Sequence, residues 1–392
     1  MIITQVDIYI HKFDQHYRLR GVEDTPGLLP GTDYFFEPHW RQAYSRKIEA
    51  CLIKLTTDTG LTGWGEAQAP LLPETSASIL KNLLGPFLLG KNPLRRTWIY
   101  DQLYHINNIR GHSGGFMLDA ITAVDIALWD LAGKHYDAPI CELAGGPFTT
   151  ELTAYVSGLR QPTLEEQCEA AGKYMEEGFA GIKIFPGDRI EETARAVRKA
   201  AGPDARLFLD LLWQCRTQEA LRLGRVLETE GYEFLEAPIQ PEDTEGHQKL
   251  VQALDIDIAV GEALRTPFEF HTWFENRALE VAQPDVVRTG LTSAFKISAL
   301  AEARRIPVAP HVGVCTGIGM AATWQYAAAI PTFLIQEFQL ELTARANNIL
   351  STPLETRNGK LIVPQRPGIG VEVDEAALAE VTEDHWTLNA SA

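Results

Sequence analysis

Six acidic or basic residues recur at a nearly constant interval through the second half of the chain, and each closes a short apolar run. Their spacings are 26, 26, 23, 26 and 26 residues, and they are, in order, Asp210, Glu236, Glu262, Asp285, His311 and Glu337. A helix-like segment follows each run, which is the period of a strand, loop and helix unit, slightly shorter than the ~30 residues per unit of a typical eightfold barrel. Because a barrel gathers the carboxyl ends of its strands around one mouth, these six side chains are predicted to form one site.

Two further apolar runs precede these six, ELTAYVSG from residue 151 and GIKIF at 181–185, so the pattern predicts eight strands. The last strand lies near 332–338, and no further unit of this kind follows it. We therefore expect an α/β fold class over residues 136–338, in the form of a modified (β/α)7β TIM-type barrel.

Residues 1–135 have a different order, with strands first and helices afterwards, which is typical of an α+β module. After a first strand at 2–10, a hairpin is predicted at 50–57 and 61–66. The predicted helices lie at roughly 73–86, 93–107 and 117–135. Since 392 residues exceed what one hydrophobic core usually holds, we expect this module to be a separate capping domain.

Two segments lie outside these regular patterns. Residues 14–48 are rich in Gly, Pro and aromatic residues. Long loops inside compact domains are usually functional or disordered, and the many aromatic side chains favour a lid. Residues 339–392 begin with a turn and a short strand and end in a short helix at 375–386. This C-terminal segment is expected to return to the capping domain.

Composition excludes several classes of function. A formal net charge of −17 argues against a nucleic-acid partner and against an acidic membrane surface. No apolar run approaches the ~18 residues of a membrane span, and the N-terminus lacks the pattern of a signal peptide. Five cysteines without CxxC spacing indicate a reducing compartment. These features together predict a cytoplasmic protein.

Three of the six residues have the chemistry of a metal site. Asp210, Glu236 and Glu262 would offer hard oxygen ligands on consecutive strands, without Cys or His, which suits Mg²⁺ or Mn²⁺ rather than zinc. Mg²⁺ usually keeps positions for water and substrate oxygens, so the predicted partner is a small-molecule carboxylate substrate.

Two others suit proton transfer. His311 follows one unit after Asp285, and an Asp beside a His fixes its tautomer and raises its basicity. With a metal to stabilise an enediolate, this pair is predicted to abstract a proton α to a carboxylate.

The chain resembles the enolase superfamily in its mandelate racemase-like branch, and the resemblance covers almost its whole length. It rests on AVDIALWDLAGKHYDAPICELAGG at 123–146, LFLD at 207–210, FLEAP at 234–238, GEALRT at 261–266, the stretch from QPDVVRTG at 283 to PVAPH at 311, and PGIGVEVD at 367–374. The resemblance implies a capping domain on a modified barrel and Mg²⁺ held by Asp210, Glu236 and Glu262. It also implies a His311–Asp285 acid/base dyad, a substrate contact from Glu337 and assembly into a homo-oligomer.

The chain departs from the branch at two positions. The branch carries Lys-x-Lys at the end of the second barrel strand, and this sequence reads GIKIF. We prefer the register in which Lys183 is the first Lys and Phe185 replaces the second, which is the base on the face opposite His311. In the other register Lys183 is itself the second base. Leu212 stands where the branch has a polar residue, which indicates either a differently oriented substrate or ordinary packing.

These departures favour elimination over racemisation, because racemisation needs a base on each face of the substrate. We predict a hydro-lyase, a Mg²⁺-dependent acid-sugar (aldonate-type) dehydratase that gives a 2-keto-3-deoxy acid. The alternatives are a racemase, epimerase or cycloisomerase of the same superfamily, or a catalytically silent metal- or metabolite-binding barrel. Further candidates for substrate contacts are His39, Trp40, Arg46, Arg110 and His112.

Overall fold

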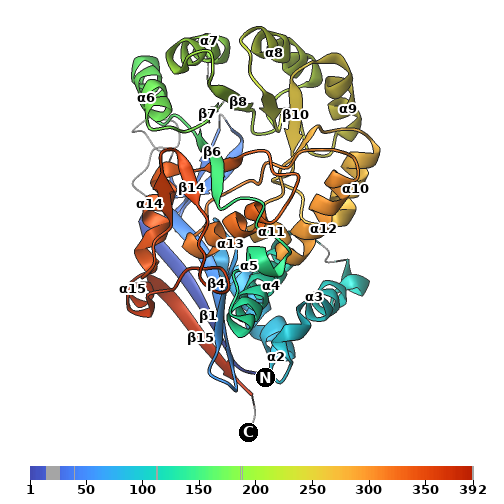
Figure 1. Cartoon of the computed structure of the whole chain (residues 1–392), viewed down its shortest axis with the longest axis vertical. Coiled ribbons are helices and arrows are strands. Elements are labelled where there is room, and N and C mark those ends of the chain that lie inside the picture. The colour runs from blue at the N-terminus through green and yellow to red at the C-terminus, as the bar shows by residue number, and fades with distance from the viewer. Residues whose placement is uncertain (15–26, 39, 112–113, 186, 188, 391–392) are drawn as a thin grey trace.

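The computed structural model describes residues 1–14, 27–38, 40–111, 114–185, 187 and 189–390, and its larger part is a closed barrel (Figure 1). The barrel closes because its last strand pairs in parallel with its first. Its strands in chain order are β6 (Glu151–Ser157), β7 (Gly181–Ile184), β8 (Arg206–Asp210), β9 (Phe234–Glu236), β10 (Asp257–Val260), β11 (Val281–Ala282) and β12 (Gln336–Phe338). Neighbours from β6 to β11 are also paired in parallel.

One further position of the barrel is held by single bridges instead of a continuous ladder. Val308 bridges Ala282 on one side and Phe333 on the other, and His311 bridges Asp285. This segment lies between β11 and β12 and completes eight strand positions. The predicted (β/α)7β barrel is thus confirmed.

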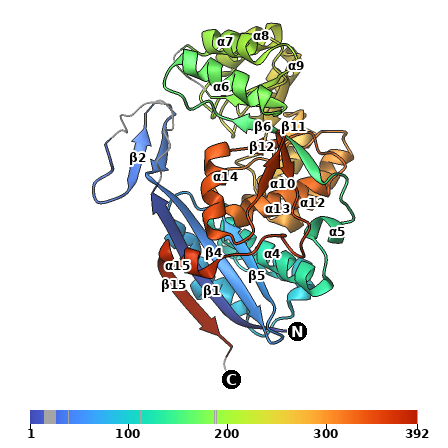
Figure 2. The same ribbon diagram turned by 60° about the vertical axis from the view of Figure 1, so that its left-hand side comes forward.

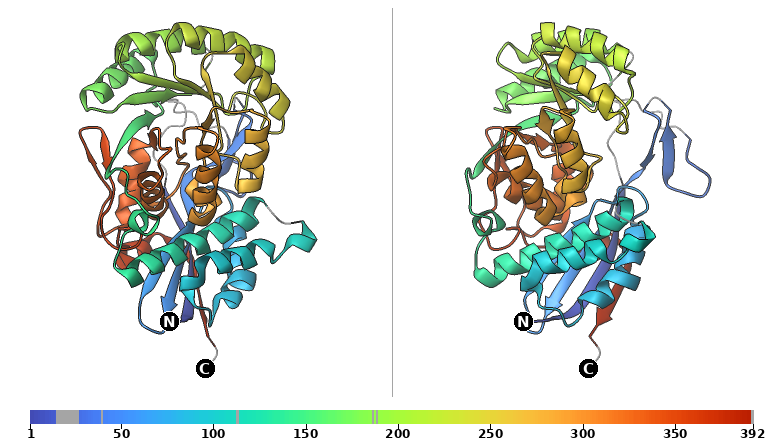
Figure 3. Two further views of the ribbon diagram at one scale, coloured as in Figure 1. Left: turned by 45° about the vertical axis from the view of Figure 1, so that its right-hand side comes forward. Right: turned by 90° about the vertical axis from the view of Figure 1, so that its right-hand side faces the viewer.

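Helices cover the outside of the barrel and form an arc around its strands (Figure 3). Two of them begin with a Thr that accepts a hydrogen bond from a Glu three residues later, at Thr163 and Thr266, a capping box that satisfies free backbone donors. The outer helices are α6 (Leu164–Glu176), α7 (Ile190–Ala201), α8 (Thr217–Thr229), α9 (Thr244–Ala253), α10 (Pro267–Glu275), α11 (Val286–Thr289), α12 (Leu291–Glu302) and α13 (Gly317–Ala328).

Aromatic side chains fill the barrel interior. The rings of Phe208 and Phe234 stack at 4.1 Å, and Tyr155 lies 4.8 Å from Phe208. Small residues such as Ala259 and Ala309 complete this cluster. The barrel is therefore a packed core, and the polar residues at the strand ends lie on a rigid floor.

The capping domain is a four-stranded sheet with helices on one face. Its order is β15 (Thr382–Asn389), β1, β4 and β5, all antiparallel, and α4 packs against β5. A Cβ on Gly65 of β5 would lie 1.9 Å from the carbonyl oxygen of Ala123 in α4, so only glycine allows this close packing. The elements are β1 (Ile3–Asp14), β4 (Lys47–Thr57), β5 (Thr62–Ala67), α1 (Pro73–Ile79), η1 (Leu80–Leu84), α2 (Gly85–Leu88), η2 (Pro93–Arg95), α3 (Arg96–His105), η3 (Asn108–Arg110), α4 (Gly115–Tyr136) and α5 (Ile140–Leu143).

The C-terminal segment divides between the two modules. Its first part pairs with the barrel, since β14 lies antiparallel to β6, and its last strand β15 lies beside β1 (Figure 2). The predicted helix at 375–386 is wrong in its second half, because the helix ends at Glu380 and the following residues alternate along β15. The elements are α14 (Leu340–Ala346), η4 (Asn347–Ile349), β13 (Glu355–Arg357), β14 (Lys360–Ile362), α15 (Glu375–Glu380) and β15 (Thr382–Asn389).

The predicted lid segment contains a hairpin, β2 (Tyr34–Glu37) and β3 (Gln42–Ser45). This hairpin extends from the capping domain toward the barrel side that bears α6 (Figure 2). Residues 15–26 of the segment lie outside the described residues. Within the described part of the chain, no helix has both the length and the apolar character that a membrane span requires.

Candidate active site

Four carboxylates meet at the carboxyl ends of the barrel strands. Asp210 and Glu236 are the last residues of β8 and β9 and pair across those strands. Glu262 lies two residues beyond β10, and Glu337 lies in β12. Asp210, Glu236 and Glu337 are each 2% exposed or less, so each charge there must find a partner.

Lys183 is the cation at the centre of this group. Its Nζ lies 2.8 Å from Glu236 Oε1, 2.9 Å from Glu337 Oε1 and 3.7 Å from Asp210 Oδ2. Burial would lower the pKa of Lys183, but Glu236 and Glu337 raise it well above its ordinary value. Lys183 is therefore an ammonium ion in this arrangement.

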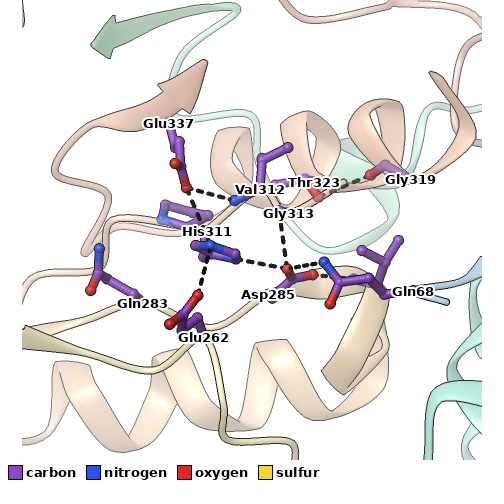
Figure 4. A network of polar contacts seen from close by, with 12 residues as sticks. Gln68, Glu262, Gln283, Asp285, His311, Val312, Gly313, Gly319, Thr323 and Glu337 are labelled. Atoms are coloured by element: carbon purple, nitrogen blue, oxygen red, sulfur yellow. Dashed lines mark hydrogen bonds and ion pairs between the residues drawn. The ribbon is translucent and has the colours of Figure 1, made fainter. Parts of the chain in front are cut away.

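His311 and Asp285 form the second part of the site. His311 Nδ1 lies 2.8 Å from Asp285 Oδ2, whereas Nε2 faces Glu262 Oε2 at 3.3 Å and Glu337 Oε2 at 3.7 Å (Figure 4). Burial would lower the pKa of His311, but the carboxylates of Glu337, Asp285 and Glu262 raise it well above its ordinary value. The contact with His311 Nε2 in turn lowers the pKa of Glu262 to about 2, although burial of Glu262 acts in the opposite direction.

The three predicted metal ligands have suitable chemistry but are paired with other groups in this structure. Glu236 Oε2 accepts from Gln283 Nε2 at 2.7 Å, and Glu262 Oε1 accepts from Trp213 Nε1 at 2.7 Å. Among the described residues no group of three His, Cys, Asp or Glu side chains is arranged to hold a metal ion. Burial and the nearby carboxylate of Glu236 nevertheless raise the pKa of Asp210 well above its ordinary value, because Lys183 does not neutralise the whole cluster. This deficit of positive charge and the all-oxygen ligand set fit a divalent cation.

A cavity of about 320 Å³ opens beside this cluster. His311 and Lys183 line it from the barrel, and Trp40 and Gln68 line it from the capping domain. Phe185 and Leu212 also line it, so both positions at which the sequence departs from the family face the cavity. A cavity of this size between two domains is a typical place for a small ligand.

Phe185 and Leu212 are held by the residues around them. The ring of Phe185 lies 5.7 Å from Lys183 Nζ and 6.3 Å from the ring of Trp40. Leu212 has φ 49°, a left-handed conformation that is costly for a side chain with a Cβ, and its backbone N–H donates to Asp210 Oδ1 at 2.8 Å. This turn therefore fixes one oxygen of the first predicted metal ligand.

The remaining predicted contacts have different outcomes. Trp40 is buried at the cavity, and its carbonyl oxygen accepts from Gln214 Nε2 at 2.6 Å. Arg46 and Arg110 are exposed and are not among the described residues that line the cavity. His39 and His112 lie outside the described residues. Roles for these side chains stay predictions.

Three polar residues of the site were not predicted from the sequence. Gln283 binds Glu236, and Gln68 Nε2 donates to Asp285 Oδ2 at 3.1 Å. Arg288 lines the cavity, and its Nε is buried without a hydrogen-bond partner in the described part of the chain. Gln283 and Arg288 belong to the stretch QPDVVRTG, which includes Asp285. Their closeness to Asp285 in the sequence was the available signal.

Glu66 joins the capping domain to the loop that follows His311. It is completely buried and accepts from Thr316 N at 2.7 Å, Thr316 Oγ1 at 2.6 Å and Gly319 N at 2.9 Å. Its carboxylate therefore caps the N-terminus of α13 from another domain. Burial raises the pKa of Glu66 to about 7, although these three donors oppose the rise.

Glu66→Gln is expected to change how stability depends on pH. Because folding raises the pKa of Glu66 from 4.5 to about 7, the folded protein binds this proton more tightly, and this group's contribution to stability falls as pH rises across that window. The stability lost across this window approaches about 3 kcal/mol. Glu66→Gln has no carboxyl group to titrate, so it does not lose this stability. The free energy of unfolding of the variant minus that of wild type should therefore be larger at pH 8 than at pH 5. Chemical denaturation at both pH values measures it, with exposed Glu165→Gln as control; parallel pH profiles for Glu66→Gln and wild type would contradict the prediction.

Two family models match the chain over most of its length. The model described as "Enolase C-terminal domain-like" matches residues 165–377, and the model for the N-terminal domain of mandelate racemase and muconate lactonizing enzyme matches residues 41–145. The first covers the barrel from α6 onward, and the second covers most of the capping domain.

Individual relatives extend this similarity. The chain is 32% identical over 345 residues to D-galactarolactone cycloisomerase of Agrobacterium fabrum, covering 84% of this chain and 90% of that protein. It is 30% identical over 341 residues to arabinonate dehydratase of Saccharolobus solfataricus, covering 85% and 90%. A crystal structure of an enolase superfamily member from Agrobacterium tumefaciens superposes with a TM-score of 0.93 at 30% identity and covers 98% of this chain and 100% of that one. The chain therefore belongs to the enolase superfamily, in the mandelate racemase and muconate lactonizing enzyme family.

Proposed function

We propose that this protein is a Mg²⁺-dependent dehydratase of acid sugars of the aldonate type. The observation that carries the proposal is the pairing of His311 with Asp285 at a cavity whose lining also includes Lys183 and Phe185. The hydro-lyase class agrees with the name of the arabinonate dehydratase to which the chain is similar. A cytoplasmic location and a homo-oligomeric assembly stay predictions.

His311 would move the proton. Asp285 holds Nδ1–H, so Nε2 is the nitrogen that would take the proton from C2 of the substrate. This step requires His311 to release first the Nε2 proton that its contacts with Glu262 and Glu337 favour. As the C3–O bond breaks, the same Nε2–H returns the proton to the departing hydroxyl, which leaves as water. The resulting enol becomes the 2-keto-3-deoxy acid. One imidazole can serve both steps only if C2–H and the hydroxyl lie on its side of the substrate.

The carboxylate cluster would bring positive charge to the site by holding a metal ion. Asp210, Glu236 and Glu262 are the residues that would hold Mg²⁺, which would stabilise negative charge on the substrate carboxylate. Lys183 also brings a positive charge to the same cavity, and it would further stabilise the negative charge on the substrate. In the present arrangement the three carboxylates contact Lys183, Gln283 and His311, so metal binding requires them to turn toward one another.

Phe185 argues against two-base chemistry. Inversion of C2 needs a proton donor on the face opposite His311, and a phenyl ring cannot donate or accept that proton. Lys183 Nζ lies 2.8 Å from Glu236 and 2.9 Å from Glu337, which hold it among the carboxylates. These contacts support elimination rather than racemisation.

Two buried polar atoms favour a substrate with several hydroxyls. Gln68 Oε1 and Arg288 Nε have no hydrogen-bond partner within the described residues, and both residues line the cavity. One is an acceptor and the other a charged donor, so a hydroxyl or carboxylate oxygen could satisfy them. An acid sugar carries both kinds of group.

A cycloisomerase is the second candidate, because one relative at 32% identity carries that name. Abstraction of a proton next to a carboxylate by His311 would begin either reaction. A cycloisomerase product has the mass of its substrate, whereas a dehydratase product has lost one water. Mass therefore separates the two functions.

The test is incubation of the purified protein and Mg²⁺ with a panel of aldonates, aldarates and their lactones in D₂O. We expect one or a few aldonates to yield a 2-keto acid, detected as its semicarbazone, with loss of water in the mass spectrum. Isomerisation of a lactone without loss of water would favour the cycloisomerase. Deuterium at C2 of unreacted substrate with inversion would indicate a racemase, and silence across the panel would contradict all three.

A further inference from the structure

Gln68, just beyond the end of β5 in the capping domain, reaches the dyad of the barrel. Its Nε2 donates to Asp285 Oδ2 at 3.1 Å, the same oxygen that pairs with His311 Nδ1 at 2.8 Å. Its backbone N–H donates to the carbonyl oxygen of Val287 at 3.1 Å, which fixes the backbone from which the side chain extends. Gln68 is 3% exposed. Figure 4 shows its amide on the side of Asp285 opposite His311.

The barrel alone provides weaker support for this oxygen. Asp285 Oδ1 accepts from Val287 N at 2.9 Å, but among the described residues Oδ2 has only the backbone N–H of Gly313 at 3.3 Å besides Gln68 and His311. Without the amide of Gln68, one well-placed hydrogen bond and one long one would hold the carboxylate against rotation. The plane of Asp285 would then follow His311 instead of orienting it.

Gly313 shows that the close approach of Gln68 depends on the barrel sequence. A Cβ at position 313 would lie 1.9 Å from Gln68 Nε2 and 3.4 Å from Asp285 Oδ2. A side chain there would therefore displace the amide or the carboxylate. The space for Gln68 comes from a glycine only two residues after His311.

We propose that Gln68 is a positioning residue, which holds Asp285 so that His311 keeps its proton on Nδ1 and presents Nε2 to the cavity. The inference rests on the proposed function and adds the capping domain to its machinery. It also means that the dyad is fully assembled only when the end of β5 is docked against the barrel.

Gln68→Met tests this role, because methionine has nearly the same length but no donor. We expect kcat for the substrate found in the panel to fall about 10–100-fold, as for a misplaced acid/base group. Gly313→Ala should act in the same direction. The double variant should lose little more than the worse single variant, because both remove one contact.

Gln325→Leu is the matched control. Gln325 is also a completely buried amide; it accepts from Cys141 N at 3.0 Å and donates to the carbonyl oxygen of Pro364, and it lies away from the cavity. This variant should lower the melting temperature while its folded fraction keeps the wild-type kcat. If Gln68→Met lowers only the melting temperature in the same way, Gln68 is merely structural and the proposal is wrong.

The proton signal of His311 Nδ1–H gives a readout that does not depend on turnover. It can be assigned by its absence in His311→Asn, and a firm hydrogen bond to Asp285 places it far downfield and protects it from exchange. In Gln68→Met it should move upfield and exchange faster. An unchanged signal together with wild-type kcat would overturn the proposal. If wild type converts no acid sugar, the proposed function fails, while this signal still decides whether Gln68 positions the dyad.

Discussion

His311→Asn is expected to lower kcat for dehydration about 10²–10⁴-fold, the range in which a positioned acid or base contributes. Asparagine can still accept or donate a hydrogen bond near Asp285, but it cannot take a proton from C2. Exchange of C2–H with solvent should fall with turnover, since both depend on the same nitrogen. Steady-state kinetics and deuterium incorporation by NMR measure the two effects.

The fold of this variant should survive, because Asp285 keeps its donors from Gln68, Val287 and Gly313. His385→Asn is the matched control, since His385 lies on β15 of the capping domain and contacts Asp7. That variant should keep the wild-type kcat. If His311→Asn kept C2 exchange at the wild-type rate, another group would be the base and the assignment of the dyad would be wrong.

The barrel could be predicted because each of its repeating units can be recognised within a short stretch of the sequence. Each apolar run and its closing polar residue lie within one unit, and the closure of the barrel follows from counting eight such units. Even so, the segment at Val308 makes only single bridges, and Glu262 and Asp285 lie beyond the ends of β10 and β11. Polar residues at strand ends were thus better markers of the mouth than the strands themselves.

The contacts between domains were not predictable in the same way. Gln68 and Asp285 are 217 positions apart, and only the docking of the two modules brings them together. The helix predicted at 375–386 was wrong in its second half for a related reason, since residues 382–389 become a strand by pairing with the edge of β1. Lys183 could be placed in the site from its strand, but its two close carboxylates come from β9 and β12 and were not predicted as its partners.

Lys183→Met is expected to lower the free energy of unfolding by about 3–5 kcal/mol at neutral pH without divalent metal, the usual cost of removing one partner from a buried ion pair. Methionine fills much of the same space, so lost charge dominates over lost packing. Glu236, Glu337 and Asp210 would then face one another with no cation between them. Because folding raises the pKa of Lys183, its contribution is fully present below pH 10.5 and is lost only as pH rises above that value.

Mg²⁺ should separate the structural role of Lys183 from its proposed catalytic one. In wild type a bound cation would share Glu236 and Asp210 with the ammonium group, whereas in the variant it would be their only positive partner. Added Mg²⁺ should therefore raise the melting temperature of Lys183→Met more than that of wild type, without restoring kcat. Lys54→Met is the control, since the partner of Lys54, Glu375, is exposed and such pairs contribute at most about 1 kcal/mol. Equal stability of Lys183→Met and wild type in EDTA would mean that the buried carboxylates do not depend on Lys183. If Mg²⁺ raised the melting temperature of neither protein, that result would argue against a metal at Asp210, Glu236 and Glu262.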